Sequence, residues 1–185
     1  MKLYSDRTVL EVLGKHDSRL MLNYCFKNRR HLEPWEPERN KSHLTEKNFE
    51  RIGAENHRLM EARSAFKFSA LTKDRSEIVG VCNFTNIIYG PFQACNLGYS
   101  IAEKHQGTGL MTEILTVGLE YIFSELNLHR VMANYIPSNE RSEKILLRLG
   151  FEKEGLAKSY LKIAGRWQDH VLTSKLNPKH CLSDK

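Results

Sequence analysis

The sequence predicts an α+β domain in which about four helices flank a mixed sheet of about seven strands. The chain has 185 residues, of which 41% are hydrophobic and 27% charged, a balance that suits one compact domain with its own core. Short apolar runs alternate with longer segments in which apolar residues recur every three or four positions, as in amphipathic helices. Because no Gly, Ser or Pro tract is long enough to form a linker, we place one domain over residues 8–176.

The first third of the chain predicts one strand and two helices. Residues 7–12 suit a strand, and the apolar spacing over residues 16–30 predicts the first helix. A proline-containing loop then ends that helix, because proline has no amide hydrogen and restricts the residue before it. The second helix is expected over residues 42–62, with Ser42 or Thr45 as its N-cap.

An uncharged stretch at residues 78–102 raises the alternative of a membrane span. Its polar residues and its Gly90-Pro turn instead predict two buried strands, at residues 78–88 and 93–101. A further strand is expected at residues 66–70, where apolar and polar side chains alternate. This strand forms a hairpin with the one that follows it.

The rest of the chain alternates helices with strands. One of these helices ends at Gly150, a residue that readily adopts the left-handed conformation of a helix end. The expected elements are a helix over residues 110–125, a strand over 130–136, a helix over 139–149, and strands over 151–160 and 167–176.

Charge and cysteine usage limit the possible partners and compartment. The 28 Lys and Arg against 22 Asp and Glu leave a net charge of +6, so a polyanionic partner must be considered. We expect no metal site and a cytoplasmic protein with reduced thiols, because the cysteines are far apart and form no Cys-x-x-Cys pair. These cysteines are Cys25, Cys82, Cys95 and Cys181. The first 13 residues lack the apolar run of a signal peptide, so we expect none.

The most distinctive segment lies between an uncharged strand and an amphipathic helix. It consists of Gln106, Gly107, Thr108, Gly109, Leu110, Met111 and Thr112. Glycines there let backbone amides face outward, and the positive end of the helix dipole adds to them, which predicts a site for a diphosphate ligand. A tight turn without a ligand is the alternative. The segment lacks the lysine of a kinase-type phosphate loop and the third glycine of a dinucleotide-binding fingerprint.

A second candidate feature is the helix start at Asn139. Asn139 is a natural N-cap, and Ser142 follows three positions later, so both side chains lie in or beside the first turn. Capping alone could explain both residues. Their significance comes from the phosphate-binding loop that precedes them by one strand.

Together these features resemble the GCN5-related N-acetyltransferase (GNAT) family. Gln106-x-x-Gly109-x-Met111 is similar to the family signature Gln/Arg-x-x-Gly-x-Gly/Ala, and Asn139-x-x-Ser142 is similar to its following helix. The resemblance spans about residues 8–176. It is closer still to the branch that acetylates ribosomal-protein alanine, through residues 130–139, 149–155 and 167–173.

The resemblance implies an enzyme that moves the acetyl group of acetyl-CoA to the N-terminal α-amine of a protein, most closely an alanine-starting ribosomal protein. The cofactor would lie between two splayed central strands, with its pyrophosphate on the amides of residues 106–112. Its pantetheine arm would contact Asn139 and one strand end, and the free amides there could hold the oxyanion. Ser142 would protonate the leaving thiolate. The strand end consists of Gly98, Tyr99, Ser100 and Ile101.

The sequence departs from many relatives where a catalytic base is expected. Asn96 and Asn134 stand where relatives often carry glutamate, and Leu146 replaces a frequent tyrosine acid. We hypothesise that the two asparagines hold water that relays the amine proton, with simple strand polarity as the alternative. An α-amine, with a pKa of about 7.7 to 8.0, needs far less help than a lysine near about 10.4, which favours an N-terminal substrate. Asp169 and His170 should point to opposite faces of their strand, so joint action is not expected.

The acceptor side and the basic charge leave several alternatives open. Substrate contacts are expected from the first two helices, the loop around Trp35, and Tyr160 and Trp167, although Trp35 is better explained as a packing anchor. Residues 130–185 hold 11 basic and 6 acidic residues. Three of the basic residues share one helix face, which is either solvated or binds the 3′-phosphate of coenzyme A. They are Arg141, Lys144 and Arg148.

Two rival functions follow from the same sequence. Acetylation of a small amine, such as a polyamine or an antibiotic, would need a closed acidic acceptor pocket. A non-catalytic RNA- or ribosome-binding module would need a contiguous Lys/Arg surface with exposed aromatic residues. We expect a protein N-terminus as the partner, with no direct nucleic-acid readout and no membrane.

Overall fold

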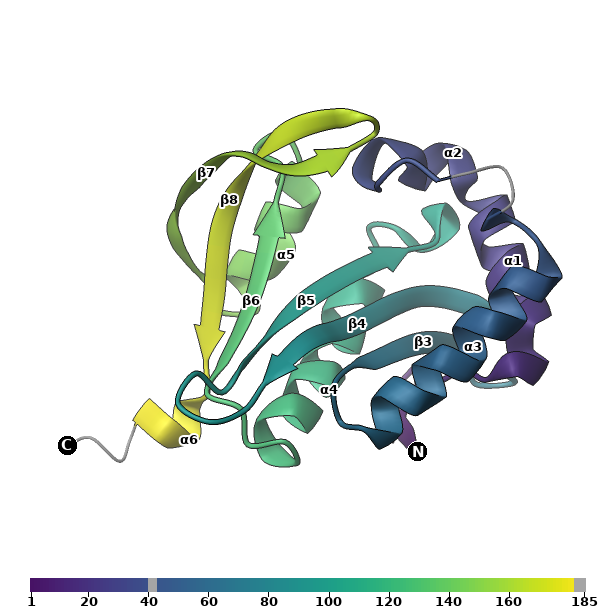
Figure 1. Ribbon diagram of the computed structural model, residues 1–185, viewed down its shortest axis with the longest axis horizontal. Helices are drawn as coiled ribbons and strands as arrows, with labels where there is room; N and C mark the ends of the chain where they lie inside the picture. The colour runs from purple at the N-terminus through teal and green to yellow at the C-terminus, as the bar shows by residue number, and fades with distance from the viewer. Residues whose placement is uncertain (40–42, 182–185) are drawn as a thin grey trace.

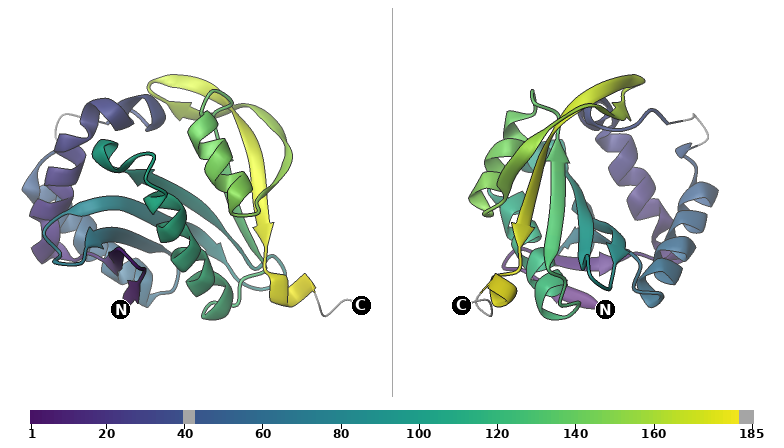
Figure 2. Two further views of the ribbon diagram at one scale, coloured as in Figure 1. Left: turned by 180° about the vertical axis from the view of Figure 1, so that it is seen from behind. Right: turned by 60° about the vertical axis from the view of Figure 1, so that its left-hand side comes forward.

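The computed structural model describes residues 1–39 and 43–181 and contains an eight-stranded mixed sheet with helices on both faces (Figure 1). The strands are β1 (Lys2–Tyr4), β2 (Thr8–Val12), β3 (Phe66–Thr72), β4 (Ile78–Ile88), β5 (Ala94–Ile101), β6 (Arg130–Tyr135), β7 (Glu152–Ile163) and β8 (Arg166–Leu176). The helices are α1 (Ser18–Lys27), α2 (Arg29–Leu32), α3 (Glu46–Glu61), α4 (Leu110–Ser124), α5 (Glu140–Arg148) and α6 (Pro178–Cys181). Helices α1 and α3 lie on one face of the sheet, and α4 and α5 lie on the other (Figure 2).

The predicted α+β class is confirmed, and the structure adds one strand and two four-residue helices to the prediction. The strand order is β1-β2-β3-β4-β5-β6-β8-β7. The added strand, β1, has three residues at the edge of the sheet, too few for a period to be recognised. Thr45 is the N-cap of α3, and its side chain accepts a hydrogen bond from the amide of Asn48 at 3.3 Å. The alternative start at Ser42 lies outside the described residues.

The predicted first helix is interrupted at Asn28, which separates α1 from α2. The Asn28 side chain is buried, and its Nδ2 donates to the carbonyl of Tyr24 at 2.8 Å. Its Oδ1 accepts from the amide of Glu103 at 2.9 Å. A side chain that bridges two distant backbone segments therefore ends the helix, a tertiary contact that periodicity cannot reveal.

The uncharged stretch forms the two paired strands β4 and β5, as predicted. The turn between them contains Gly90 in the left-handed region, at a φ of +76°. Over residues 1–39 and 43–181, no helix has the length and apolar character needed to cross a membrane.

The main core lies between the sheet and α4. A Cβ at Gly118 would stand 2.9 Å from Cys82 Sγ and 3.0 Å from Phe84 Cε2, so only glycine permits this close approach of α4 to β4. Cys25, Cys82 and Cys95 are free thiols, and burial raises the pKa of Cys95 to about 12.

The central strands β5 and β6 pair in parallel over only a short length and then diverge (Figure 1). Their pairing ends at Asn96 and Met132. Beyond this point β5 stays paired with β4 as far as Ile101, and β6 stays paired with β8 as far as Tyr135. The predicted splay of two central strands is confirmed, and it leaves one backbone edge of β5 without a strand partner.

Candidate active site

A cavity of about 320 Å³ lies beside the point where β5 and β6 part. Its wall brings together seven of the thirteen residues predicted from the sequence as the donor site, from three separate segments of the chain. These are Tyr99, Ser100, Ile101, Gln106, Met111, Asn139 and Ser142. The predicted residues Gly98, Gly107, Thr108, Gly109, Leu110 and Thr112 do not line this wall.

The loop before α4 has the backbone conformation that its glycines suggest. Gly107 and Gly109 have φ values of +74° and +76°, and Gly109 is the N-cap of α4. A Cβ at Gly107 would meet no heavy atom within 4 Å, so this part of the loop faces open space. Thr108 Oγ1 donates to the carbonyl of His105 at 2.8 Å, which stabilises the turn from inside. The Leu110 side chain is buried in the core, so only its backbone is available to a ligand.

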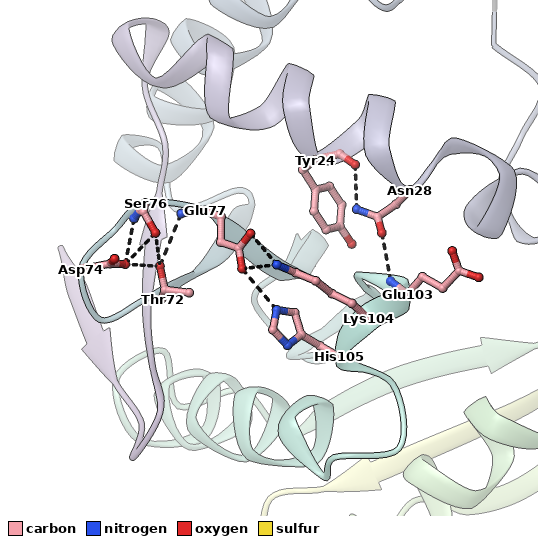
Figure 3. A network of polar contacts seen from close by, with 9 residues as sticks. All are labelled: Tyr24, Asn28, Thr72, Asp74, Ser76, Glu77, Glu103, Lys104 and His105. Atoms are coloured by element: carbon pink, nitrogen blue, oxygen red, sulfur yellow. Dashed lines mark hydrogen bonds and ion pairs between the residues drawn. The ribbon is translucent and has the colours of Figure 1, made fainter.

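The short segment before this loop is held by a polar network (Figure 3). Lys104 Nζ contacts the two carboxylate oxygens of Glu77 at 2.6 and 2.8 Å, and His105 Nε2 lies 3.4 Å from one of them. The hydrogen bond from Lys104 lowers the pKa of Glu77 below its ordinary value. On the other side, Asn28 holds the amide of Glu103 at 2.9 Å. The loop is thus anchored to the residue before β4 and to the C-cap of α1.

At the start of α5, a hydroxyl group is fixed in the cavity wall. Asn139 Oδ1 accepts a hydrogen bond from the amide of Ser142 at 3.1 Å, so Asn139 is the N-cap that the sequence predicts. Ser142 Oγ lies 2.6 Å from Tyr99 Oη. Burial raises the pKa of Tyr99 to about 12, although its hydrogen bond with Ser142 acts in the opposite direction. Tyr99 is therefore protonated at neutral pH.

Only one of the three candidate phosphate-binding cations lines the cavity. Arg141 Nη1 donates to Gln106 Oε1 at 2.6 Å. Because arginine has only donors, this contact leaves the Gln106 amide nitrogen facing His31 Nε2 at 2.9 Å. Lys144 Nζ instead lies 3.4 Å from Glu140 Oε2. Arg148 is exposed and does not line the cavity.

Asn96 and Asn134 project from the same face of the sheet. Asn96 is paired with Met132, and Asn134 is two residues further along the same strand as Met132. Asn134 Nδ2 donates to Tyr160 Oη at 3.4 Å, and its Oδ1 accepts from the amide of Thr173 at 3.4 Å. Within the described part of the chain, no hydrogen bond joins the two asparagines.

The other candidate acids and bases lie apart from the cavity. Asp169 Oδ1 accepts from the amide of Ser159 at 2.8 Å, whereas the buried His170 packs against the Tyr160 ring with a centroid separation of 5.6 Å. Their separate partners agree with the predicted opposite directions. Leu146 is fully buried in the core.

Seven cavity residues were not among the predicted site residues, and three of these lie far from the predicted segments in the sequence. His31, Leu32 and Trp35 come from α2 and the turn after it, and they line the wall of the cavity. The proline-containing loop was the sequence feature that could have indicated these residues, but from it we predicted Trp35 to be a packing anchor. Trp35 is 40% exposed and borders the donor site, which makes a ligand contact possible in addition to packing.

The residues present fit acetyl-CoA as a donor. The unpaired edge of β5 offers backbone groups to an amide-containing arm, and a Cβ at Gly98 would meet no heavy atom within 4 Å. The open loop at Gly107 and the adjacent N-terminus of α4 suit a pyrophosphate. Among the described residues, no group of three His, Cys, Asp or Glu side chains could hold a metal ion.

Comparison with known proteins agrees with this donor site. The family model described as acetyltransferase (GNAT) domain matches residues 7–152. The chain is 46% identical over 179 residues to the [ribosomal protein uS5]-alanine N-acetyltransferase of Escherichia coli K12, covering 96% of this chain and 92% of that protein.

Two solved structures are similar over nearly the whole chain. The ribosomal-protein-S5-alanine acetyltransferase from Vibrio fischeri has a TM-score of 0.92 at 38% identity, with 96% of this chain and 97% of that one covered. Mycobacterium smegmatis RimJ in complex with CoA-disulfide has a TM-score of 0.90 at 26% identity, with 97% and 88% covered.

Proposed function

This chain belongs to the GNAT family of acetyltransferases, and from this premise we propose that it acetylates the N-terminal alanine of ribosomal protein uS5. The observation that carries the reaction is the cavity beside the parted strands β5 and β6, walled by Tyr99, Asn139 and Ser142. The choice of acceptor rests on similarity to enzymes that are named for this reaction. A ribosomal-protein acceptor requires a cytoplasmic enzyme.

The donor half of the reaction follows from the backbone conformation around the donor cavity. Acetyl-CoA supplies an activated acetyl thioester. The amides of residues 106–112 hold its pyrophosphate at the N-terminus of α4, and the free edge of β5 holds the pantetheine arm. An amide on the same edge stabilises the oxyanion that forms when the thioester carbonyl is attacked. Ser142 donates a proton to the sulfur as the thiolate leaves.

The acceptor half needs only modest assistance with proton transfer. A free α-amine titrates at about 7.7 to 8.0, so a useful fraction is unprotonated at neutral pH. Asn96 and Asn134 project from the same sheet face, and both are half-buried side chains that can bind water. Water held there carries the proton of the attacking amine to the solvent, so no single carboxylate base is required.

Peptide acetylation tests this proposal. Thiol release from acetyl-CoA is followed with peptides that begin with the uS5 sequence, with matched peptides beginning Ser, Thr or Met, and with spermidine as a small amine. We expect the highest kcat/KM with the alanine peptide and no release when its α-amine is blocked. Release that survives blocking but requires a lysine side chain would overturn the N-terminal assignment, and a preference for spermidine would favour the small-amine reading.

The non-catalytic alternative is tested by the same preparation. An RNA- or ribosome-binding module would bind RNA in a salt-sensitive manner and would not be stabilised by acetyl-CoA. We expect acetyl-CoA to raise the melting temperature of the protein, because the folded chain binds it and the unfolded chain does not.

A further inference from the structure

We propose that Tyr99 is a positioning residue that orients the Ser142 hydroxyl toward the leaving sulfur. This role rests on the proposed function, because a leaving thiolate exists only in acyl transfer from a thioester. Tyr99 lies on β5 and Ser142 lies in the first turn of α5, and both line the donor cavity. Their hydroxyl oxygens are 2.6 Å apart.

The proposed role requires the Tyr99 hydroxyl to donate to Ser142 Oγ, which lies 2.6 Å away. Among the described residues, the Tyr99 hydroxyl contacts two oxygen atoms, both of residue 142: Oγ at 2.6 Å and the carbonyl oxygen at 3.4 Å. The nearer contact has the usual length of a hydroxyl–hydroxyl hydrogen bond, a geometry open to either oxygen as donor, and in the proposed arrangement Tyr99 donates to Ser142 Oγ. The proton of Ser142 must then point away from Tyr99, and the cavity is the open direction.

The backbone of Ser142 is fixed independently of its side chain. Asn139 Oδ1 accepts from the Ser142 amide at 3.1 Å, which holds the first turn of α5. With the amide fixed by Asn139 and Oγ fixed by Tyr99, Ser142 is oriented before the donor binds. A donor group that is already oriented stabilises the developing charge without first having to reorganise.

The atoms balance without a further reactant. The nitrogen lone pair of the amine forms the C–N bond, the C–S bond breaks, and its electron pair goes to sulfur. Sulfur takes the proton of Ser142 while the Tyr99 O–H donates to the negative charge that develops on Oγ. Ser142 then recovers a proton from the solvent, which has received one from the acetylated amine. Burial keeps Tyr99 protonated, since its pKa is raised to about 12, so the donor is present at neutral pH.

A double-mutant cycle of Tyr99→Phe and Ser142→Ala tests this role. Tyr99→Phe keeps the ring and removes only the hydroxyl, so we expect kcat to fall about 10- to 100-fold with the KM for acetyl-CoA little changed. Ser142→Ala should lower kcat about 100-fold or more. In the Ser142→Ala background, Tyr99→Phe should change kcat by less than about 2-fold, because the group it orients is gone.

Tyr135→Phe is the matched control. Tyr135 is also buried, and its hydroxyl donates to Glu143 at 3.2 Å, beside Ser142 on the same helix. We expect this variant to keep the kcat of the wild-type protein. A Tyr99→Phe variant with wild-type kcat, or one that raises only the KM for acetyl-CoA, would overturn the proposal. An equal loss of kcat in both backgrounds would also overturn it, since that is the result of a purely structural role.

The choice of acceptor separates this proposal from the proposed function. The cycle is measured with whichever amine the wild-type protein acetylates best. If that amine is not the uS5 peptide, the proposed acceptor is wrong, but the cycle still reports on Tyr99. If no amine supports thiol release by the wild-type protein, both proposals fail.

Discussion

Replacing Asn139 with alanine removes a helix cap and, by the proposed function, a contact to pantetheine. The Asn139 side chain accepts from the Ser142 amide at 3.1 Å and lines the donor cavity. Asn139→Asp is the informative partner variant, because a carboxylate still caps the helix but cannot donate a hydrogen bond. The two variants therefore separate folding stability from donor binding.

The size of each effect follows from these contacts. Loss of an asparagine cap costs about 1 kcal/mol of unfolding free energy, which lowers Tm by about 2–4 °C in a chain of this size. Loss of one hydrogen bond to a neutral ligand costs about 0.5–1.5 kcal/mol, which weakens acetyl-CoA binding by about 2- to 10-fold. Asn139→Ala should show both effects. Asn139→Asp should keep the Tm of the wild-type protein and lose only affinity.

Thermal unfolding of the ligand-free protein and calorimetric titration with acetyl-CoA measure the two quantities separately. Thr45→Ala is the control, since Thr45 caps α3, whose residues do not line the donor cavity. It should lower Tm without changing the affinity for acetyl-CoA. If Asn139→Ala binds acetyl-CoA as tightly as Thr45→Ala does, Asn139 serves only the helix, and its assignment to the donor site is refuted.

Three further changes test other parts of the molecule. Arg141→Ala should weaken acetyl-CoA binding several-fold and leave acetyl-dephospho-CoA binding unchanged if Arg141 meets the 3′-phosphate, whereas the exposed Lys144→Ala should alter neither affinity in the same titration. Gly118→Val should lower the unfolding free energy by about 1–3 kcal/mol or more in chemical denaturation, because even a Cβ would stand 2.9 Å from Cys82 Sγ; a wild-type value would contradict the packing described. Glu77→Gln should lower the unfolding free energy at pH 7. The difference in unfolding free energy between the variant and the wild-type protein should narrow as the pH falls below 4.5, the ordinary pKa of a glutamate. The pKa of Glu77 is lowered in the folded state by Lys104, so its contribution is present above that pH and is lost below it; a pH-independent difference in denaturation curves would refute this role.

Much of the fold could be predicted from local patterns. In its central elements, apolar residues recur with the period of a helix or a strand, and turn or cap residues mark where each element ends. The uncharged strands β4 and β5, the apolar stripe of α4 and the Gly150 stop after α5 all signal their structure within a short stretch of chain. The features that hydrophobic periodicity did not predict depend on contacts between residues far apart in the sequence. The break at Asn28 exists because its side chain binds Glu103, 75 residues away.

The donor site was predictable where the chain presents it as one segment. The residues around Gly107 and the cap at Asn139 have recognisable local chemistry, and the structure brings both segments to the same region of the fold. The pairing of Tyr99 with Ser142 was not predictable, because the two residues are 43 positions apart and meet only through the packing of α5 against the sheet. His31 reaches the cavity by the same kind of tertiary placement, since α2 follows a helix break that the sequence does not reveal.

Locating the acetyl group on intact uS5 is the most direct test of the proposed function. Unacetylated uS5 is incubated with acetyl-CoA and the wild-type protein, and the modified residue is identified by fragmentation mass spectrometry. We expect one acetyl group on the α-amine of the N-terminal alanine, and none with the Ser142→Ala variant over the same time. Acetylation on lysine side chains alone, or no acetylation of uS5 while another amine is modified, would contradict the assignment.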